Sequence, residues 1–222
     1  MIVELYGLTG SGKTYLSNKL KERGFSLSKF DSKFSKYLNS VFFIFLHPVL
    51  SFSLWHNLSR FPNNSTNLLP LRKRLKLNLT RNILLLATMA QYMESRSHRD
   101  AVVLDEGFFQ IIHTVFERKV KDYKLKRLME LIPKPEILIL VNSTKESRER
   151  RFAQGGYPRK DEFGSKYFDE WYEVMKLNDL KIRKVLKDED YNFLIREFDI
   201  PKNYSQALDG LIKEINERRG KN

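Results

Sequence analysis

Residues 7–14 read Gly-Leu-Thr-Gly-Ser-Gly-Lys-Thr and fit the pattern G-x-x-x-x-G-K-T, directly after the apolar run 2–6. Glycines let the backbone N–H groups of such a loop turn inward around a polyphosphate. Lys13 is expected to reach the β- and γ-phosphates of ATP, and the Thr14 hydroxyl is expected to bind Mg²⁺. The residues predicted to hold the nucleotide in this loop are Gly7, Thr9, Gly10, Ser11, Gly12, Lys13 and Thr14.

Two carboxylates follow a second apolar run, in the order Asp105-Glu106-Gly107 after Val102-Val-Leu. In a parallel sheet, the end of this strand opens at the same edge as the loop of residues 7–14. Phosphoryl transfer needs a magnesium clamp and a group that orients the acceptor hydroxyl. We therefore predict that Asp105 holds Mg²⁺ and that Glu106 faces the acceptor. The alternative is a pair of ordinary acids at a strand end.

A third carboxylate, Asp31, ends the apolar run 25–30. A carboxylate at this strand end can take the proton of an acceptor hydroxyl. Aspartate is equally suited to cap the N-terminus of a helix that starts near Ser32. Both roles stay open, and one residue can serve both.

Arginines gather around the Gly155-Gly156 pair: Arg148, Arg150, Arg151 and Arg159. Guanidinium groups match phosphate oxygens, and glycines permit the backbone change that a hinge needs. The segment 145–165 is therefore predicted to be a lid that closes over the triphosphate, with Arg148 among its nucleotide contacts. The alternative is a charged helix that only faces solvent.

The apolar runs and helical periods alternate along the chain. The predicted strands are 2–6, about 25–30, 101–105, 136–142 and 192–198. The predicted helices are 13–23, 34–60, 75–96, 107–131, 144–154, 165–187 and 203–219. This alternation predicts an α/β fold with a five-stranded parallel sheet covered by helices on both faces. We expect one domain over residues 1–222, in which the helical region 32–98 binds the acceptor.

The composition limits the partners and the compartment. The chain has no cysteine, which excludes disulfides, zinc–thiolate sites and thiol nucleophiles and fits a reducing cytoplasm. The net charge of +13 favours an anionic partner, namely a polyphosphate, a nucleic acid or an acidic membrane surface. Residues 41–55 carry no charge but are too few to span a membrane, and Pro48 interrupts them. They are either buried helices that line the acceptor pocket or an apolar surface that contacts lipid.

With these motifs in this order, the sequence resembles the P-loop kinases of the thymidylate kinase and deoxynucleoside kinase group, which have an NMP-kinase-like fold. In motif, the resemblance covers residues 7–14, 105–107, 148–159 and, loosely, 198–207. It implies a five-stranded parallel core, a helical acceptor-binding insertion and an arginine lid.

The resemblance also implies roles for two lid arginines. Arg151 matches the first lid arginine of the family, and Arg159 or Gln154 substitutes for the second. The sequence departs from the family after the third predicted strand. Family members there show Asp-Arg-Tyr or Glu-Arg-Ser, whereas this chain has Asp105-Glu106-Gly107. It lacks the arginine that in the family helps to hold a nucleoside or nucleotide acceptor.

Together these features predict an ATP-dependent phosphotransferase that uses Mg²⁺ and moves the γ-phosphate to a hydroxyl or phosphate of a small molecule. The acceptor classes left open are nucleosides or nucleotides, sugars and lipid-linked sugars. A polynucleotide 5′-hydroxyl kinase and a membrane-associated nucleotide-switch NTPase are the alternatives. We expect a cytoplasmic protein; peripheral contact with the inner membrane face or with nucleic acid, and a homodimer, are left open.

Overall fold

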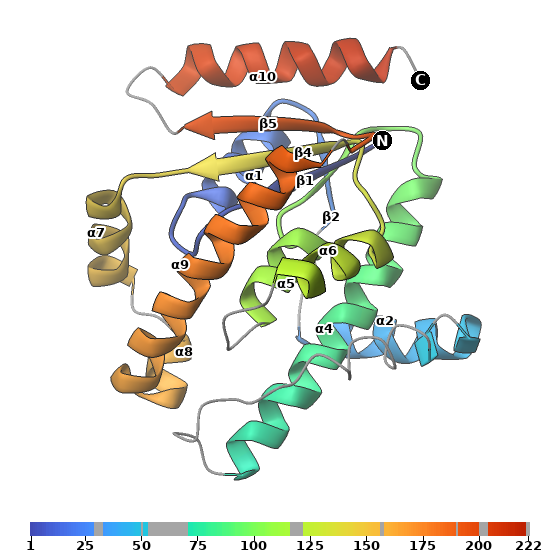
Figure 1. Cartoon of the computed structure of the whole chain (residues 1–222). Helices are drawn as coiled ribbons and strands as arrows, with labels where there is room; N and C mark the ends of the chain where they lie inside the picture. The colour runs from blue at the N-terminus through green and yellow to red at the C-terminus, as the bar shows by residue number, and fades with distance from the viewer. Residues whose placement is uncertain are drawn as a thin grey trace.

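The computed structural model describes residues 1–28, 33–49, 51–52, 71–115, 122–155, 158–189, 191–199 and 204–220. Its sheet contains five strands in the order β2-β3-β1-β4-β5, and every neighbouring pair is parallel (Figure 1). The strands are β1 (Ile2–Tyr6), β2 (Ser26–Ser28), β3 (Val102–Leu104), β4 (Ile137–Asn142) and β5 (Leu194–Asp199). The predicted five-stranded parallel sheet is confirmed.

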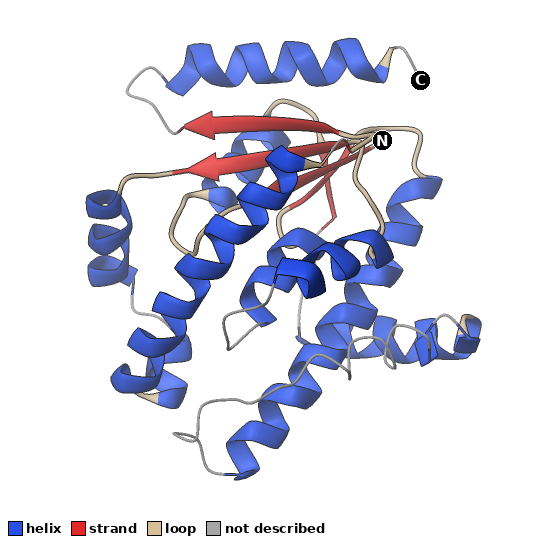
Figure 2. Cartoon of the chain, viewed as in Figure 1, coloured by secondary structure: helices blue, strands red, loops and turns tan. Residues whose placement is uncertain are grey.

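Helices cover both faces of the sheet (Figure 2). On one face, α1 (Lys13–Glu22) and α10 (Tyr204–Arg219) share an apolar core with the strands. On the other face, the core includes residues of α4 (Leu71–Ser97), α5 (Phe108–Val115), α6 (Asp122–Leu131) and α9 (Ser165–Asp188). The remaining helices are α2 (Lys33–Leu46), α7 (Lys145–Gly155) and α8 (Pro158–Phe163).

Strand β1 lies at the centre of the sheet and is buried at every position. Because successive side chains of a strand point to opposite faces, Val3 and Leu5 pack toward α1 and α10, whereas Ile2 and Tyr6 pack toward α4 and α5. Glu4 has the same parity as Ile2 and Tyr6 and is also fully buried. A carboxylate thus enters the core beneath α4 and α5.

The register of the sheet brings the two chemical motifs together. Glu4 of β1 pairs with Leu104 of β3, so the chain leaves both strands at the same edge. The loop of residues 7–14, called the phosphate loop below, follows β1, and the carboxylates Asp105 and Glu106 follow β3. The two motifs therefore start side by side, as expected for parallel strands.

Several helices differ from their predicted bounds. Two helices, α5 and α6, stand where one was predicted over 107–131, and residues 116–121 between them lie outside the described part of the chain. Helix α4 begins at Leu71, directly after Pro70, rather than at residue 75. Helix α2 ends at Leu46, two residues before Pro48, whose ring cannot continue a regular helix. Asp31 lies outside the described residues.

The expectation that residues 41–55 form buried pocket-lining helices is wrong for their described part. Most large apolar side chains of α2 are exposed, and Phe43 is the buried one among those described. Helix α2 has more apolar side chains than its contact with α4 buries, so the others face outward. Within the described residues, no helix combines the length and apolarity needed to cross a membrane.

Candidate active site

The loop between β1 and α1 has the backbone of an anion-binding site. Gly10 and Gly12 have φ values of 78° and 102°, a region that favours glycine over any residue with a Cβ. A Cβ at Gly7 would lie 2.4 Å from the Val141 carbonyl oxygen. Helix α1 then begins at Lys13 with no acidic residue in its first turn and no side-chain cap. Its N–H groups and positive dipole end suit the phosphates of a nucleotide.

Lys13 is half-buried and folds back on the loop. Its Nζ donates to the carbonyl oxygens of Gly7, at 2.9 Å, and Leu8, at 3.2 Å. Burial lowers the Lys13 pKa to about 8, although the charges of Asp105, Glu106 and Asp179 act in the opposite direction. The negative charge of a nearby polyphosphate would favour the protonated form of Lys13.

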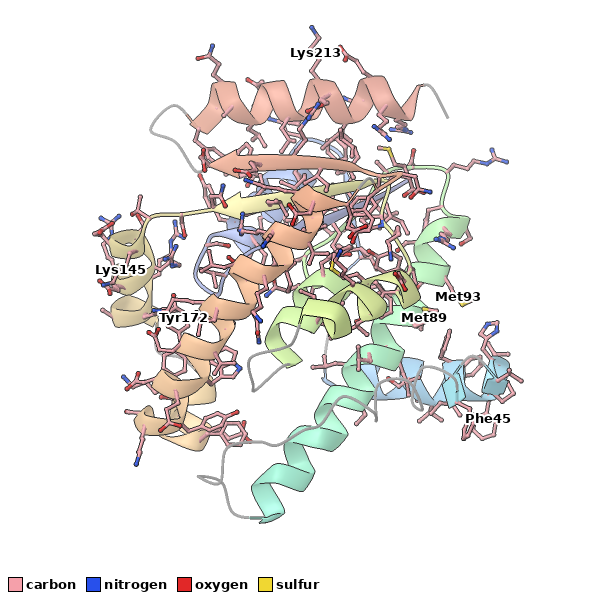
Figure 3. All side chains as sticks on the ribbon, viewed as in Figure 1. Phe45, Met89, Met93, Lys145, Tyr172 and Lys213 are labelled. Atoms are coloured by element: carbon pink, nitrogen blue, oxygen red, sulfur yellow. The ribbon has the colours of Figure 1, made fainter. Side chains whose placement is uncertain are left out.

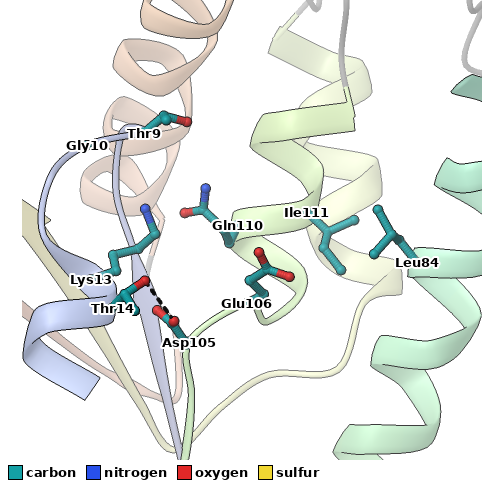
Figure 4. A pocket seen from close by; sticks show the side chains of 9 residues that line it. All are labelled: Thr9, Gly10, Lys13, Thr14, Leu84, Asp105, Glu106, Gln110 and Ile111. Atoms are coloured by element: carbon teal, nitrogen blue, oxygen red, sulfur yellow. Dashed lines mark hydrogen bonds between the residues drawn. The ribbon is translucent and has the colours of Figure 1, made fainter. Parts of the chain in front are cut away.

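Thr14 and Asp105 meet at the junction of the two motifs. The Thr14 hydroxyl donates to Asp105 Oδ2 at 3.0 Å (Figure 4). A hydroxyl and a carboxylate oxygen are hard ligands of the kind that Mg²⁺ prefers, and the ion usually keeps several waters. These two side chains fit the role of holding Mg²⁺ beside the nucleotide phosphates.

A cavity of about 250 Å³ opens beside this pair. Its wall is formed by Thr9, Gly10, Lys13, Thr14, Leu84, Asp105, Glu106, Gln110 and Ile111. The phosphate loop lies on one side, Leu84 and Ile111 lie on the other, and Glu106 and Gln110 stand between them (Figure 4). Both carboxylates line the cavity, but Asp105 is buried whereas Glu106 is exposed to solvent.

The predicted lid helix α7 packs against the phosphate loop. Arg151 donates from Nη1 to the Gly10 carbonyl oxygen. A Cβ at Gly10 would meet the Phe152 ring at 3.1 Å. Arg148 instead donates from Nη1 to the Ser143 carbonyl oxygen and from Nε to the Tyr172 hydroxyl, at 3.2 Å.

The predicted site residues are thus brought together to different degrees. Thr9, Gly10, Lys13 and Thr14 of the loop line one cavity together with Asp105 and Glu106. Gly7, Ser11 and Gly12 are not in its wall; the Ser11 side chain is buried, and the Ser11 N–H donates to the Leu8 carbonyl oxygen at 2.9 Å. Neither Arg148 nor Arg151 is among the residues that line the cavity. Arg159 belongs to α8. Its side chain is not among those that the structure describes.

Sequence reasoning missed the buried carboxylate of Glu4. Its Oε1 accepts from the N–H groups of Phe109, at 2.6 Å, and Gln110, at 3.4 Å, and its Oε2 accepts from the Tyr92 hydroxyl. Glu4 therefore caps the N-terminus of α5 from below and ties it to α4. The one available signal was a single acid inside an otherwise apolar strand.

Glu4 also explains why a glycine, Gly107, follows Asp105 and Glu106. A Cβ at Gly107 would lie 2.2–2.5 Å from the Glu4 side chain. Only glycine leaves room for this carboxylate beneath the loop of Asp105 and Glu106.

Three further contacts that the sequence did not indicate hold the phosphate loop. The Gly7 N–H donates to Gln110 Oε1 at 3.2 Å. The Tyr6 hydroxyl donates to Asp179 Oδ1 at 2.7 Å, and Arg183 donates from Nε to the other oxygen of Asp179 at 2.9 Å. Thr9 contacts Met175 Sδ at 3.7 Å. Helices α5 and α9 thus fix the loop from two sides.

Stability is expected to depend on pH through Glu4. Burial raises the Glu4 pKa from 4.5 to about 7, so the folded state retains a proton that the unfolded state releases. The contribution of Glu4 to stability is therefore complete below pH 4.5, falls as pH rises toward 7, and then levels off. Each unit of the shift corresponds to about 1.4 kcal/mol.

Urea unfolding of the wild type and Glu4→Gln at pH 4.5, 6 and 8 checks this expectation. The difference in unfolding free energy between the two proteins should change in favour of the variant as pH rises. An unchanged difference would mean that Glu4 ionises normally in the folded protein.

Comparison with solved structures gives full-length similarities to kinases. The chain is similar to deoxyadenosine kinase from M. mycoides with bound dATP, at 12% identity and a TM-score of 0.58, over 97% of this chain and 99% of that one. The same enzyme with dCMP and dCDP gives a TM-score of 0.59 at 12% identity, over 98% and 100%. Thymidylate kinase from Candida albicans gives 0.52 at 15% identity, over 98% and 92%.

No model of a known protein family and no curated protein matches the sequence. The likeness therefore rests on the arrangement of the helices and strands over the whole chain. In that arrangement, the chain has the fold of the P-loop kinases of the thymidylate kinase and deoxynucleoside kinase group.

Proposed function

We propose that this protein is an ATP-dependent kinase that transfers the γ-phosphate to a hydroxyl or phosphate of a small acceptor. The observation that carries the proposal is one cavity that unites Lys13, Thr14, Asp105 and Glu106. A phosphate loop alone would support any nucleotide-binding activity. Glu106 faces the same cavity beyond the Thr14–Asp105 pair, and its carboxylate is the group that would orient an acceptor hydroxyl.

Lys13 and the loop glycines bind the triphosphate in this proposal. Lys13 Nζ exchanges the carbonyl oxygens of Gly7 and Leu8 for phosphate oxygens when ATP binds. Thr14 and Asp105 hold Mg²⁺, which when bound neutralises charge on the phosphates. Arg151, now on the Gly10 carbonyl oxygen, stands next to the loop and can turn toward the transferred phosphate.

Glu106 faces the acceptor in this proposal. It is exposed to the cavity between the phosphate loop and the apolar residues Leu84 and Ile111. From there its carboxylate can accept a hydrogen bond from an acceptor hydroxyl and take its proton. Leu84 and Ile111 offer an apolar surface against which the ring of an acceptor can pack. Nucleosides, nucleotides, sugars and lipid-linked sugars all carry both a ring and a hydroxyl group.

The proposal is tested by incubating the purified protein with γ-labelled ATP, Mg²⁺ and members of each acceptor class. Transfer of label to one class would support it. Label on the 5′-hydroxyl of an oligonucleotide would instead favour a polynucleotide kinase. ATP hydrolysis that no acceptor stimulates would favour a nucleotide-switch NTPase.

The two adjacent carboxylates are expected to give different defects. Asp105→Asn should weaken magnesium-dependent ATP binding by about tenfold or more, because the amide oxygen carries no charge for the ion. Glu106→Gln should leave ATP binding close to normal and lower the acceptor-dependent rate. Mg²⁺ titration of ATP binding, together with acceptor kinetics, measures both effects. Matching defects in the two variants would contradict this division of roles.

Arg151→Ala is expected to slow turnover by about 10²-fold while weakening ATP binding far less, because a charge aimed at the transferred phosphate acts on the barrier. Arg150→Ala is the matched control, since Arg150 lies exposed on the same helix. Turnover and ATP affinity are measured for both variants. Equal, small effects of the two substitutions would mean that Arg151 does not act on the transferred phosphate.

A further inference from the structure

The outer face of α2 is apolar and exposed. The exposed fractions of Leu38, Phe42, Phe45 and Leu46 lie between 56% and 81%. Residues 38, 42 and 45 are spaced four and three apart, which places them along one side of α2. Figure 3 shows Phe45 at the outer edge of the molecule, beyond α4. Such a contiguous apolar surface marks an interaction site on a protein.

Among the described side chains of α2, Ser40 and Phe43 are the buried ones. Ser40 Oγ donates to the Ile83 carbonyl oxygen of α4 at 2.9 Å, and Phe43 packs into the core. A surface helix of a globular protein normally turns its apolar side to the core and its polar side to water. In the described part of α2, every exposed side chain is apolar instead.

The sequence from α2 into α4 carries positive charge. Residues 32–93 contain no Asp or Glu, and they contain eight Lys or Arg: Lys33, Lys36, Arg60, Arg72, Lys73, Arg74, Lys76 and Arg81. Four of these fall in the first two turns of α4. In Figure 1, α2 lies across α4, and the first turns of α4 form the end of the molecule opposite α10.

We propose that the exposed apolar face of α2 docks on an anionic lipid surface. Apolar side chains of a helix lying in the interface enter the boundary between headgroups and acyl chains. Lysine and arginine near the surface each gain about 1 kcal/mol from anionic headgroups. A second copy of the chain would bury the same apolar side chains, but it would bring a second carboxylate-free basic region against the first. The charge therefore favours lipid.

The docking inference is independent of the kinase activity and is tested without ATP. Full-length protein is floated with vesicles of phosphatidylcholine alone or of phosphatidylcholine mixed with phosphatidylglycerol, at low and high salt. We expect partition onto the mixed vesicles, weaker partition onto the neutral ones, and a decrease with salt, because salt screens the headgroup charge.

The double variant Phe42→Gln/Phe45→Gln should lower partition onto the mixed vesicles by more than about tenfold, because two apolar rings no longer leave water. Leu180→Gln is the matched control, since Leu180 is exposed to a similar extent on α9. Circular dichroism and the thermal midpoint report whether both variants are folded. All of the replaced side chains are exposed, so both variants should retain the wild-type fold.

Three results would overturn the docking proposal. The first is a wild type that does not float with mixed vesicles. The second is equal partition of the wild type and the folded double variant. The third is a wild-type dimer in light scattering that the double variant disrupts while vesicle binding is absent, which would assign the face to a second copy of the chain.

Discussion

Lys13→Ala is expected to lower the rate of phosphoryl transfer by about 10²–10³-fold, the loss typical of removing one preorganised contact to developing charge. The structure gives the reason. Lys13 Nζ lies within the phosphate loop and already donates to the Gly7 and Leu8 carbonyl oxygens, so it is held where the β- and γ-phosphates would bind. Its removal leaves these two carbonyl oxygens open to water in the cavity.

Lys19→Ala is the matched control for this variant. Lys19 lies on the same helix, and its Nζ contacts Glu22 at 2.6 Å on the surface. Both variants should unfold at nearly the wild-type temperature, since neither side chain is part of the apolar core. Near-normal turnover by folded Lys13→Ala would remove the basis for the phosphate-loop assignment.

Gly107→Ala is expected to have the largest effect on stability. The new methyl group would lie 2.2–2.5 Å from a Glu4 side chain that is fully buried and hydrogen-bonded on both oxygens. Overpacking of this kind costs about 1–3 kcal/mol or more. In a chain of this size, each kcal/mol lowers the unfolding midpoint by about 2–4 °C. Calorimetry measures the shift.

A double-mutant cycle shows whether the cost arises at Glu4. In Glu4→Ala the carboxylate is absent, so adding Gly107→Ala should destabilise the protein much less than it does in the wild type. Gly210→Ala is a control for the effect of glycine replacement itself, since a Cβ at Gly210 meets nothing within 4 Å. Additive effects of Glu4→Ala and Gly107→Ala would mean that the two residues do not compete for space.

The sequence was sufficient to predict that the loop of residues 7–14 and the carboxylates of Asp105 and Glu106 come together. Both motifs are local, and parallel strands must bring their carboxyl ends to one edge. The contacts beneath them could not be predicted, because Glu4 meets Tyr92 and Phe109 across 88 and 105 residues. No local pattern encodes such pairs, so the sequence did not indicate that Gly107 makes room for Glu4.

The apolar stretch around α2 shows another limit of sequence reasoning. Hydropathy alone does not say whether Phe42 and Phe45 pack inward or outward. The answer depends on how much of α4 is available to cover them, which is a property of the fold. Asp31 keeps both of its predicted roles, because it lies outside the described residues.

Helix α9 joins parts of the molecule that are distant in sequence. Tyr172 accepts from Arg148 of α7, Met175 contacts Thr9 of the phosphate loop, and Asp179 accepts from Tyr6 at the end of β1. These three residues are spaced three and four apart and so share one stripe of the helix. Helix α9 therefore fixes the distance between α7 and the phosphate loop. One inserted residue would rotate the stripe by about 100° and break this alignment while every side chain of the active site remained in place.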